Sequence, residues 1–154
     1  METVRDILNK KLLNFDEDTS VDKVAKALGQ YDVGCVIITR NKKPIGIITE
    51  RDMVRRVIAR NLDSKKLKAK SIMTSPVESL DQNTNIYYAG KVMREKGYQR
   101  YPVVGNGKII GIITQADIID YFTQQRKKFV LKYLNKSLRK HYLWKNFLNQ
   151  QNGK

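Results

Sequence analysis

The chain has 154 residues, with 30 Lys and Arg against 15 Asp and Glu, one Cys and one His. The length corresponds to about one ordinary domain, and 41% hydrophobic with 29% charged residues excludes a disordered or fibrous protein. A single cysteine excludes an internal disulfide. Because Cys35 lies in the apolar run 35–38, we expect a buried thiol in a reducing compartment rather than a reactive one.

The first residues mix both charges and contain no apolar core of a signal peptide. The longest apolar runs are far shorter than the roughly 20 residues that span a bilayer. We therefore expect a soluble, cytoplasmic protein.

The positive charge is unevenly distributed along the chain. Residues 1–67 have an excess of 4 positive charges, residues 68–120 an excess of 2, and residues 121–154 an excess of 9 with no acidic residue. Most of the imbalance belongs to a C-terminal tail.

Two copies of one sequence pattern follow each other at a spacing of 65 residues without a gap. Residues 45–52, IGIITERD, align with residues 110–117, IGIITQAD. Thr19 aligns with Thr84 and Asp16 with Asp81, and apolar positions align with apolar positions. The chain is therefore an internal repeat.

Each copy predicts the same elements in the same order. A short strand near 12–13 precedes a helix over about 21–28, which Thr19 or Ser20 caps. Two β-branched runs at 35–39 and 45–49 form a hairpin, and a second helix covers about 50–60. After a lysine-rich linker at 61–70, the second copy predicts elements at 77–78, 86–93, 101–104, 109–114 and 115–125. The fold class is α/β, with two β-α-β-β-α units.

This order of elements, with Gly-Ile-Ile-Thr-x-x-Asp opening a helix in both copies, resembles the cystathionine-β-synthase (CBS) domain. Two copies over residues 2–125 resemble a CBS pair, or Bateman module. The resemblance implies that the repeats pack sheet to sheet about a pseudo-twofold axis and that the pair forms a homodimer. It also implies clefts that bind AMP, ADP, ATP or S-adenosylmethionine. The expected domains are 1–67, 68–125 and a helical tail at 126–154.

The Thr-x-x-Asp motif has two interpretations that are compatible. Thr49 with Asp52, and Thr114 with Asp117, have the spacing of a capping box at a helix N-terminus. The same groups suit a nucleotide, because a carboxylate favours a ribose diol while free N–H groups favour phosphate. We assign both aspartates to ribose and both threonines to ribose or α-phosphate.

The two clefts are not expected to be equivalent. In the second copy Arg100 matches a phosphate-binding position of the family, whereas the first copy has Cys35 there and has Arg51 within its motif. Either arginine could instead be a solvated surface charge. We expect the preferred cleft to contain Thr74, Val77, Tyr98, Arg100, Pro102, Thr114 and Asp117, and the second cleft to contain Leu12, Val33, Thr49, Arg51 and Asp52.

Neither catalysis nor metal binding finds support in the sequence. His141 lies in the tail, away from both motifs, and no phosphate-binding loop, zinc pattern or nucleophile elbow occurs. We expect neither enzyme activity nor a metal cofactor.

The tail combines positive charge with seven of the 13 aromatic residues. Leu131, Leu134, Leu138 and Tyr142 follow helical spacing, which predicts a long amphipathic helix. Its apolar face could pack on the CBS pair or a partner subunit, and its basic face could bind RNA or DNA. A membrane-surface helix is a third reading, although we do not expect membrane contact. The basic residues for nucleic acid are Arg126, Lys127, Lys128, Lys132, Lys136, Arg139, Lys140 and Lys145.

The sequence thus predicts a regulatory CBS pair that binds an adenosyl ligand and signals to an unidentified partner protein. The alternative is a nucleic-acid-binding protein in which the CBS pair is a dimerisation scaffold.

Overall fold

The computed structural model describes residues 2–133 together with residues 138, 140, 141, 143 and 145. The chain divides into two compact units, residues 1–118 and residues 119–154. The first unit contains both repeats. The helices of the described chain include none with the length and apolar character needed to cross a membrane.

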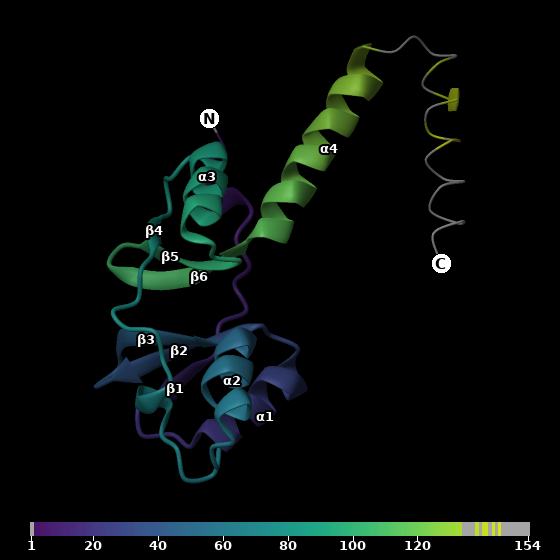
Figure 1. Cartoon of the computed structure of the whole chain (residues 1–154). Coiled ribbons are helices and arrows are strands. Elements are labelled where there is room, and N and C mark those ends of the chain that lie inside the picture. Colours follow the sequence, from purple (N-terminus) through teal and green to yellow (C-terminus); the bar gives the residue numbers. More distant parts are fainter. Residues whose placement is uncertain (1, 134–137, 139, 142, 144, 146–154) are drawn as a thin grey trace. The chain divides into compact units, whose positions relative to one another are not determined.

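Each repeat folds into a three-stranded sheet with helices (Figure 1). In both sheets a short first strand pairs in parallel with the middle strand, and the last two strands form an antiparallel hairpin. The expected α/β fold with two β-α-β-β-α units is confirmed. The first repeat comprises β1 (Asn14–Asp16), α1 (Val21–Tyr31), β2 (Cys35–Arg40), β3 (Lys43–Thr49), α2 (Glu50–Arg56) and the 3₁₀ turn η2 (Ile58–Arg60). The second comprises β4 (Leu80–Asp81), α3 (Ile86–Lys96), β5 (Arg100–Gly105), β6 (Lys108–Thr114) and α4 (Gln115–Tyr133).

The helix starts follow the expected capping chemistry. The Ser20 side chain accepts a hydrogen bond from the Lys23 backbone at the start of α1, and Asn85 accepts two at the start of α3. These bonds satisfy backbone N–H groups that the first helical turn leaves unpaired.

Two expected boundaries are wrong. The leading strands begin two to three residues later than the expected positions at 12–13 and 77–78, because the parallel pairing uses residues 14–16 and 80–81. The last helix does not stop at 125. It continues as α4 to Tyr133 because residues 115–133 contain neither Gly nor Pro to end it. The expected domain boundaries stay a prediction, and Leu134, Lys136, Arg139 and Tyr142 of the expected tail helix lie outside the described residues.

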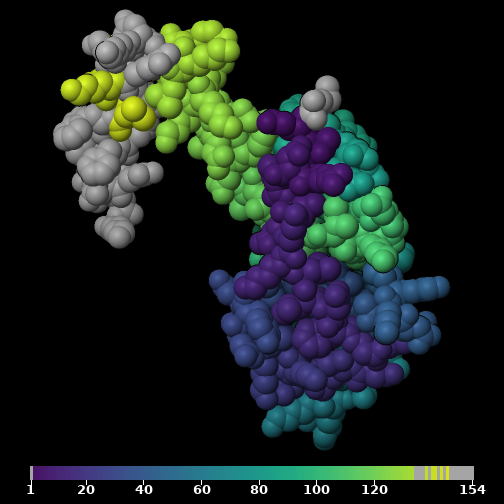
Figure 2. Space-filling model, turned by 180° about the vertical axis from the view of Figure 1, so that it is seen from behind, coloured from purple at the N-terminus to yellow at the C-terminus, as the bar shows by residue number. Residues whose placement is uncertain are grey.

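The segment before each repeat packs on the other repeat. The first leading segment (residues 4–9) includes the 3₁₀ turn η1 (Val4–Asp6), and the second (residues 69–74) includes η3 (Ala69–Ser71). Asn9 exchanges two backbone hydrogen bonds with Ile112 of β6, with N···O distances of 2.8 and 2.9 Å. Thr74 does the same with Ile47 of β3, at 2.9 and 3.0 Å. In Figure 2 the purple N-terminal segment crosses from the second repeat to the first.

The same exchange recurs at the outer end of each leading segment. The Val4 N–H donates to the Thr84 carbonyl at 2.9 Å, and the Ala69 N–H donates to the Thr19 carbonyl at 2.8 Å. Positions 4 and 69, like 19 and 84, differ by 65 residues, so the two sets of bonds are related by the internal repeat. Each repeat therefore makes the same contacts with the other, as a pseudo-twofold axis between them requires.

Middle strand β2 is buried on both faces. Val36 and Ile38 face the core of the first repeat, together with Ala69 and Ile72 from the second leading segment. On the opposite face of β2, Cys35 and Ile37 pack with Ile112 of the second repeat, and Leu12, Ile47 and Ile109 surround them. The repeats therefore meet sheet to sheet, as expected, and a middle strand with two buried faces reads as a continuous apolar run.

A glycine in the last strand of each repeat allows the leading segment to approach. A Cβ on Gly111 would lie 2.4 Å from Leu8 Cδ1 and 2.5 Å from the Asn9 carbonyl oxygen. A Cβ on Gly46 would lie 2.5 Å from Met73 Sδ. Both positions require the absence of a side chain.

Replacing Gly111 with Ala should lower the free energy of unfolding by about 1–3 kcal/mol, because the Asn9 backbone is held by two hydrogen bonds and must shift. Urea denaturation monitored by circular dichroism measures the change. The matched control is Gly29→Ala in α1, where a Cβ meets nothing within 4 Å and stability should rise by about 0.5–1 kcal/mol. Equal stability of Gly111→Ala and the wild type would contradict the close approach.

Candidate functional site

A pocket of about 520 Å³ lies within the first unit, where the start of α2 meets the second leading segment and the loop between α3 and β5. This volume is in the range of ligand sites, roughly 300–1,000 Å³. The lining residues come from both repeats: Ile47, Thr49, Arg51, Asp52, Arg55, Arg56, Thr74, Ser75, Pro76, Glu78, Lys96, Gly97, Tyr98, Gln99, Arg100, Tyr101 and Pro102.

One wall of the pocket is the N-terminus of α2. Asp52 Oδ2 accepts hydrogen bonds from the Thr49 N–H and from Thr49 Oγ1, both at 2.8 Å, and the Asp52 N–H donates to Thr49 Oγ1 at 3.3 Å. The predicted capping box is therefore present, and a carboxylate stands at the positive end of the helix.

Arg56 ties this carboxylate to the second leading segment. Its Nε lies 3.3 Å from Asp52 Oδ1. Its guanidinium also donates to the Ile72 carbonyl at 2.6 Å and to Thr74 Oγ1 at 3.0 Å. One half-buried side chain thus connects α2 of the first repeat with the leading segment of the second repeat.

The opposite wall carries a hydrogen-bonded group of Glu78, Lys96 and Tyr101. Tyr101 Oη donates to Glu78 Oε2 at 2.6 Å, and Lys96 bonds the same oxygen. The hydrogen bond from Lys96, followed by that from Tyr101, lowers the pKa of Glu78. Burial, together with the adjacent carboxylate, raises the pKa of Tyr101. Glu78 is therefore held as an anion and Tyr101 as a neutral donor.

Arg100 crosses from the second repeat to the first. Its Nη2 lies 3.3 Å from Glu50 Oε2, at the start of α2. A Cβ on Gly34 would lie 1.9 Å from that nitrogen, so the guanidinium fits only because residue 34 has no side chain. Glu50 is 61% exposed and Arg100 is 29% exposed, which leaves the pair open to exchange with a bound anion.

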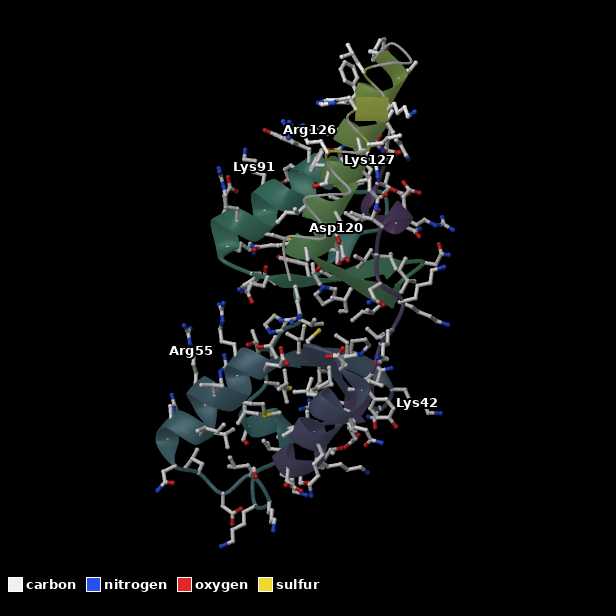
Figure 3. All side chains as sticks on the ribbon, turned by 90° about the vertical axis from the view of Figure 1, so that its right-hand side faces the viewer. Lys42, Arg55, Lys91, Asp120, Arg126 and Lys127 are labelled. Carbon is white, nitrogen blue, oxygen red and sulfur yellow. The ribbon has the colours of Figure 1, made fainter. Side chains whose placement is uncertain are left out.

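The lining has an excess of positive charge, with five basic side chains and two acidic ones. Asp52 and Glu78 are both engaged by neighbours, whereas Arg51 and Arg55 are exposed. Figure 3 labels Arg55 on α2. Such a pocket favours an anionic ligand.

The structure groups the predicted residues differently from the sequence. Thr74, Tyr98, Arg100 and Pro102, which we expected beside Thr114 and Asp117, line the same pocket as Thr49, Arg51 and Asp52. The expected grouping is corrected for a physical reason: each leading segment pairs with the hairpin of the other repeat, so Thr74 lies beside β3 rather than β6.

The remaining predicted residues do not line this pocket. Val77 is half-buried, Leu12 packs against the inter-repeat cluster, and Val33 packs against the core of the first repeat. Thr114 and Asp117 form a second capping box, in which Asp117 Oδ2 accepts from the Thr114 N–H and Oγ1 at 2.7 Å.

Several lining residues were missed in the sequence. Arg56 had a readable signal, because it follows Asp52 by four positions on one helix, where opposite charges meet. No sequence signal predicted the group of Glu78, Lys96 and Tyr101, because the path of the second leading segment decides whether these side chains meet.

Cys35 is buried, as expected, and lies close enough to Arg100 and Glu50 for their charges to act on its thiol. Burial raises the pKa of its thiol to about 11, and the positive charge of Arg100 opposes that shift.

The fold agrees with comparisons to known proteins. The CBS domain family matches residues 4–59 and 69–124. The chain belongs to the CBS domain family. An uncharacterized protein from Methanopyrus kandleri is 33% identical over 119 residues, covering 76% of this chain but 61% of that relative. This CBS pair therefore spans about three fifths of that relative's length.

Two similar solved structures contain bound ligands or ions. The pair of protein MJ0100, in complex with 5′-methylthioadenosine and S-adenosyl-L-methionine, has a TM-score of 0.72 and 26% identity, covering 81% of this chain and 98% of that one. Hypoxic Response Protein I, with two coordinated zinc ions, has a TM-score of 0.68 and 28% identity, covering 78% and 98%. In the part of this CBS pair that the structure describes, no three His, Cys, Asp or Glu side chains gather as metal ligands.

Native Cys35 should react with Ellman's reagent at pH 8 roughly 100-fold more slowly than the urea-unfolded chain. A pKa raised from 9.0 to about 11 reduces the thiolate, the nucleophilic form, by about that factor. The stability that the neutral thiol contributes should persist below pH 9 and decline as the pH rises toward 11. Equal rates in the folded and unfolded chains would contradict the buried thiol.

Proposed function

We propose that this CBS pair binds an adenine nucleotide (AMP, ADP or ATP) in the pocket and that occupancy regulates a partner protein. The observation that carries the proposal is that five basic but only two acidic side chains line a pocket formed by both repeats. Adenosyl ligands in a related CBS pair support the adenosine part. The charge favours phosphorylated adenosine over S-adenosylmethionine, whose sulfonium centre is positive.

Each part of the nucleotide has a counterpart in the pocket. Asp52 would accept hydrogen bonds from the ribose diol through Oδ1, which lies 3.3 Å from Arg56 Nε and is not the oxygen that accepts from Thr49. Thr49 would bind ribose or α-phosphate. Arg51, Arg55 and Arg100 would bind phosphate, since charge-assisted hydrogen bonds to phosphate are stronger than neutral ones. The apolar parts of Pro76 and Tyr98 would flank the base.

The second Thr-x-x-Asp motif supports a second site of the same kind. Thr114 and Asp117 repeat the capping geometry of the first motif. Leu12 and Val33, which we expected beside Thr49 and Asp52, do not line the pocket that contains those residues, and we reassign them to this second site. Because Ala116 replaces Arg51 there, we expect it to bind phosphate more weakly.

Regulation would act through the exchange of charge partners. A bound phosphate competes with Glu50 for Arg100, and Asp52 reaches the second leading segment through Arg56. A ligand that engages both repeats therefore favours one arrangement of the pair by its differential affinity. The partner that reads this arrangement would be a second copy of the chain or another protein.

Replacing Arg100 or Arg51 with Gln should weaken AMP binding by about 10- to 100-fold, the loss of one charge-assisted hydrogen bond. Binding of 5′-methylthioadenosine, which has no phosphate, should change less than about twofold. Isothermal titration calorimetry of both ligands measures the effect. The control is Arg60→Gln, which removes an exposed charge outside the pocket lining. Loss of both ligands in equal measure would contradict phosphate binding, and no binding of either would reject the proposed function.

Replacing Asp52 with Asn should weaken AMP and 5′-methylthioadenosine alike, by roughly tenfold, because both contain the ribose diol. The matched control is Asp6→Asn. Asp6 accepts from the Thr3 N–H at 2.8 Å in the same kind of capping box, but it does not line the pocket. If the two variants bind both ligands as the wild type does, Asp52 serves only as a helix cap.

A further inference from the structure

A row of exposed apolar and aromatic side chains runs along α4 beyond the CBS pair. Ile119, Phe122, Phe129 and Tyr133 are 64%, 43%, 63% and 67% exposed. Their spacing of three, seven and four positions places them on one face of a helix. Phe129 and Tyr133 contact each other, with ring centroids 4.6 Å apart. These four residues are the aromatic row.

Arg126 lies within the aromatic row and Lys132 beside it, while Lys127 and Lys128 lie on other faces of the same helix. Arg126, at the centre of the row, Lys127, Lys128 and Lys132 are all exposed. Lys132 Nζ lies 5.5 Å from the centroid of the Tyr133 ring. The last acidic residue of the chain is Asp120, near the start of α4, and Figure 3 labels it with Arg126 and Lys127. The exposed rings thus share their face with Arg126 and adjoin Lys132, in a segment whose sequence contains no acidic residue after Asp120.

We propose that this face of α4 binds single-stranded nucleic acid, independently of the adenine-nucleotide site. Unpaired bases stack on exposed aromatic rings without regard to sequence, and a groove or face of basic residues follows the phosphates. A duplex offers only its phosphates, because its bases already stack on each other. Both features of the face therefore have a counterpart in a single strand.

Charge decides against the other occupants of the face. A second copy of α4 on the aromatic row would bring two sets of basic residues together with no acidic residue after Asp120 to pair with them. A membrane-surface helix buries a continuous apolar face, whereas Arg126 interrupts this row at its centre. A polyanion with aromatic bases satisfies the charges and the rings together.

Fluorescence anisotropy with labelled 20-nucleotide poly(U) RNA and poly(dT) DNA, titrated with the full chain at several salt concentrations, tests the proposal. The wild type should bind both, and the logarithm of the affinity should fall linearly with the logarithm of salt concentration, by about 0.7 per phosphate contacted. Phe129→Leu, which keeps apolar area and helix propensity, should lower the affinity roughly 5- to 100-fold by loss of stacking. A duplex of the same length should bind more weakly and should not respond to this variant.

A charge-matched pair of variants separates the α4 face from general basicity. Arg126→Gln with Lys132→Gln, which removes the basic groups within and beside the row, should reduce the salt slope by about 1.4. Lys23→Gln with Lys43→Gln, at exposed positions of the first repeat, should leave it unchanged. Circular dichroism verifies that each variant is folded.

Four results would overturn the proposal: no binding at low salt, equal effects of the two charge-removing pairs, unchanged affinity of Phe129→Leu, or binding to anionic phosphatidylserine vesicles in place of RNA and DNA. A dimer that Phe129→Leu dissociates, with no nucleic-acid binding by the wild type, would assign the face to a second copy.

Discussion

The exchange of leading segments between the two repeats is the interaction on which the rest of the structure depends. Each three-stranded hairpin sheet has an edge with unpaired backbone groups, and the other repeat's leading segment covers that edge with two hydrogen bonds. The glycines at 46 and 111 allow the backbones to approach. Because Ala69 and Ile72 complete the core of the first repeat, neither sheet is finished without residues that precede the other one.

The pocket is a consequence of this exchange. The second leading segment passes beside β3 and brings Thr74 to the start of α2, where Arg56 bonds both Thr74 and Asp52. The loop before β5, from the second repeat, forms the other wall of the pocket. A ligand there would contact groups from both repeats, so its binding energy would depend on their relative arrangement. This dependence is what a regulatory module requires.

The two repeats share their architecture and differ in their chemistry. The capping boxes at 49–52 and 114–117 have nearly identical geometry. Around them, however, Arg51 corresponds to Ala116 and Arg56 to Tyr121, while Cys35 corresponds to Arg100. The substitutions concentrate positive charge at the first motif and leave the backbone exchange intact. Repeated backbone geometry thus maintains the fold, and side chains that differ between the copies distinguish the two Thr-x-x-Asp motifs.

The sequence by itself determined the repeat, the order of elements, the helix caps and the buried character of Cys35, because local spacing and backbone hydrogen bonding decide them. It also determined that positive charge gathers in the tail. Only the tertiary structure decided which residues share a pocket. Tyr98 and Arg100 line the same pocket as Asp52, not Asp117, because each leading segment packs on the other repeat. The spacing of residues along the chain would be the same whether each leading segment packed on its own repeat or on the other one. Spacing alone therefore does not predict which repeat a leading segment joins.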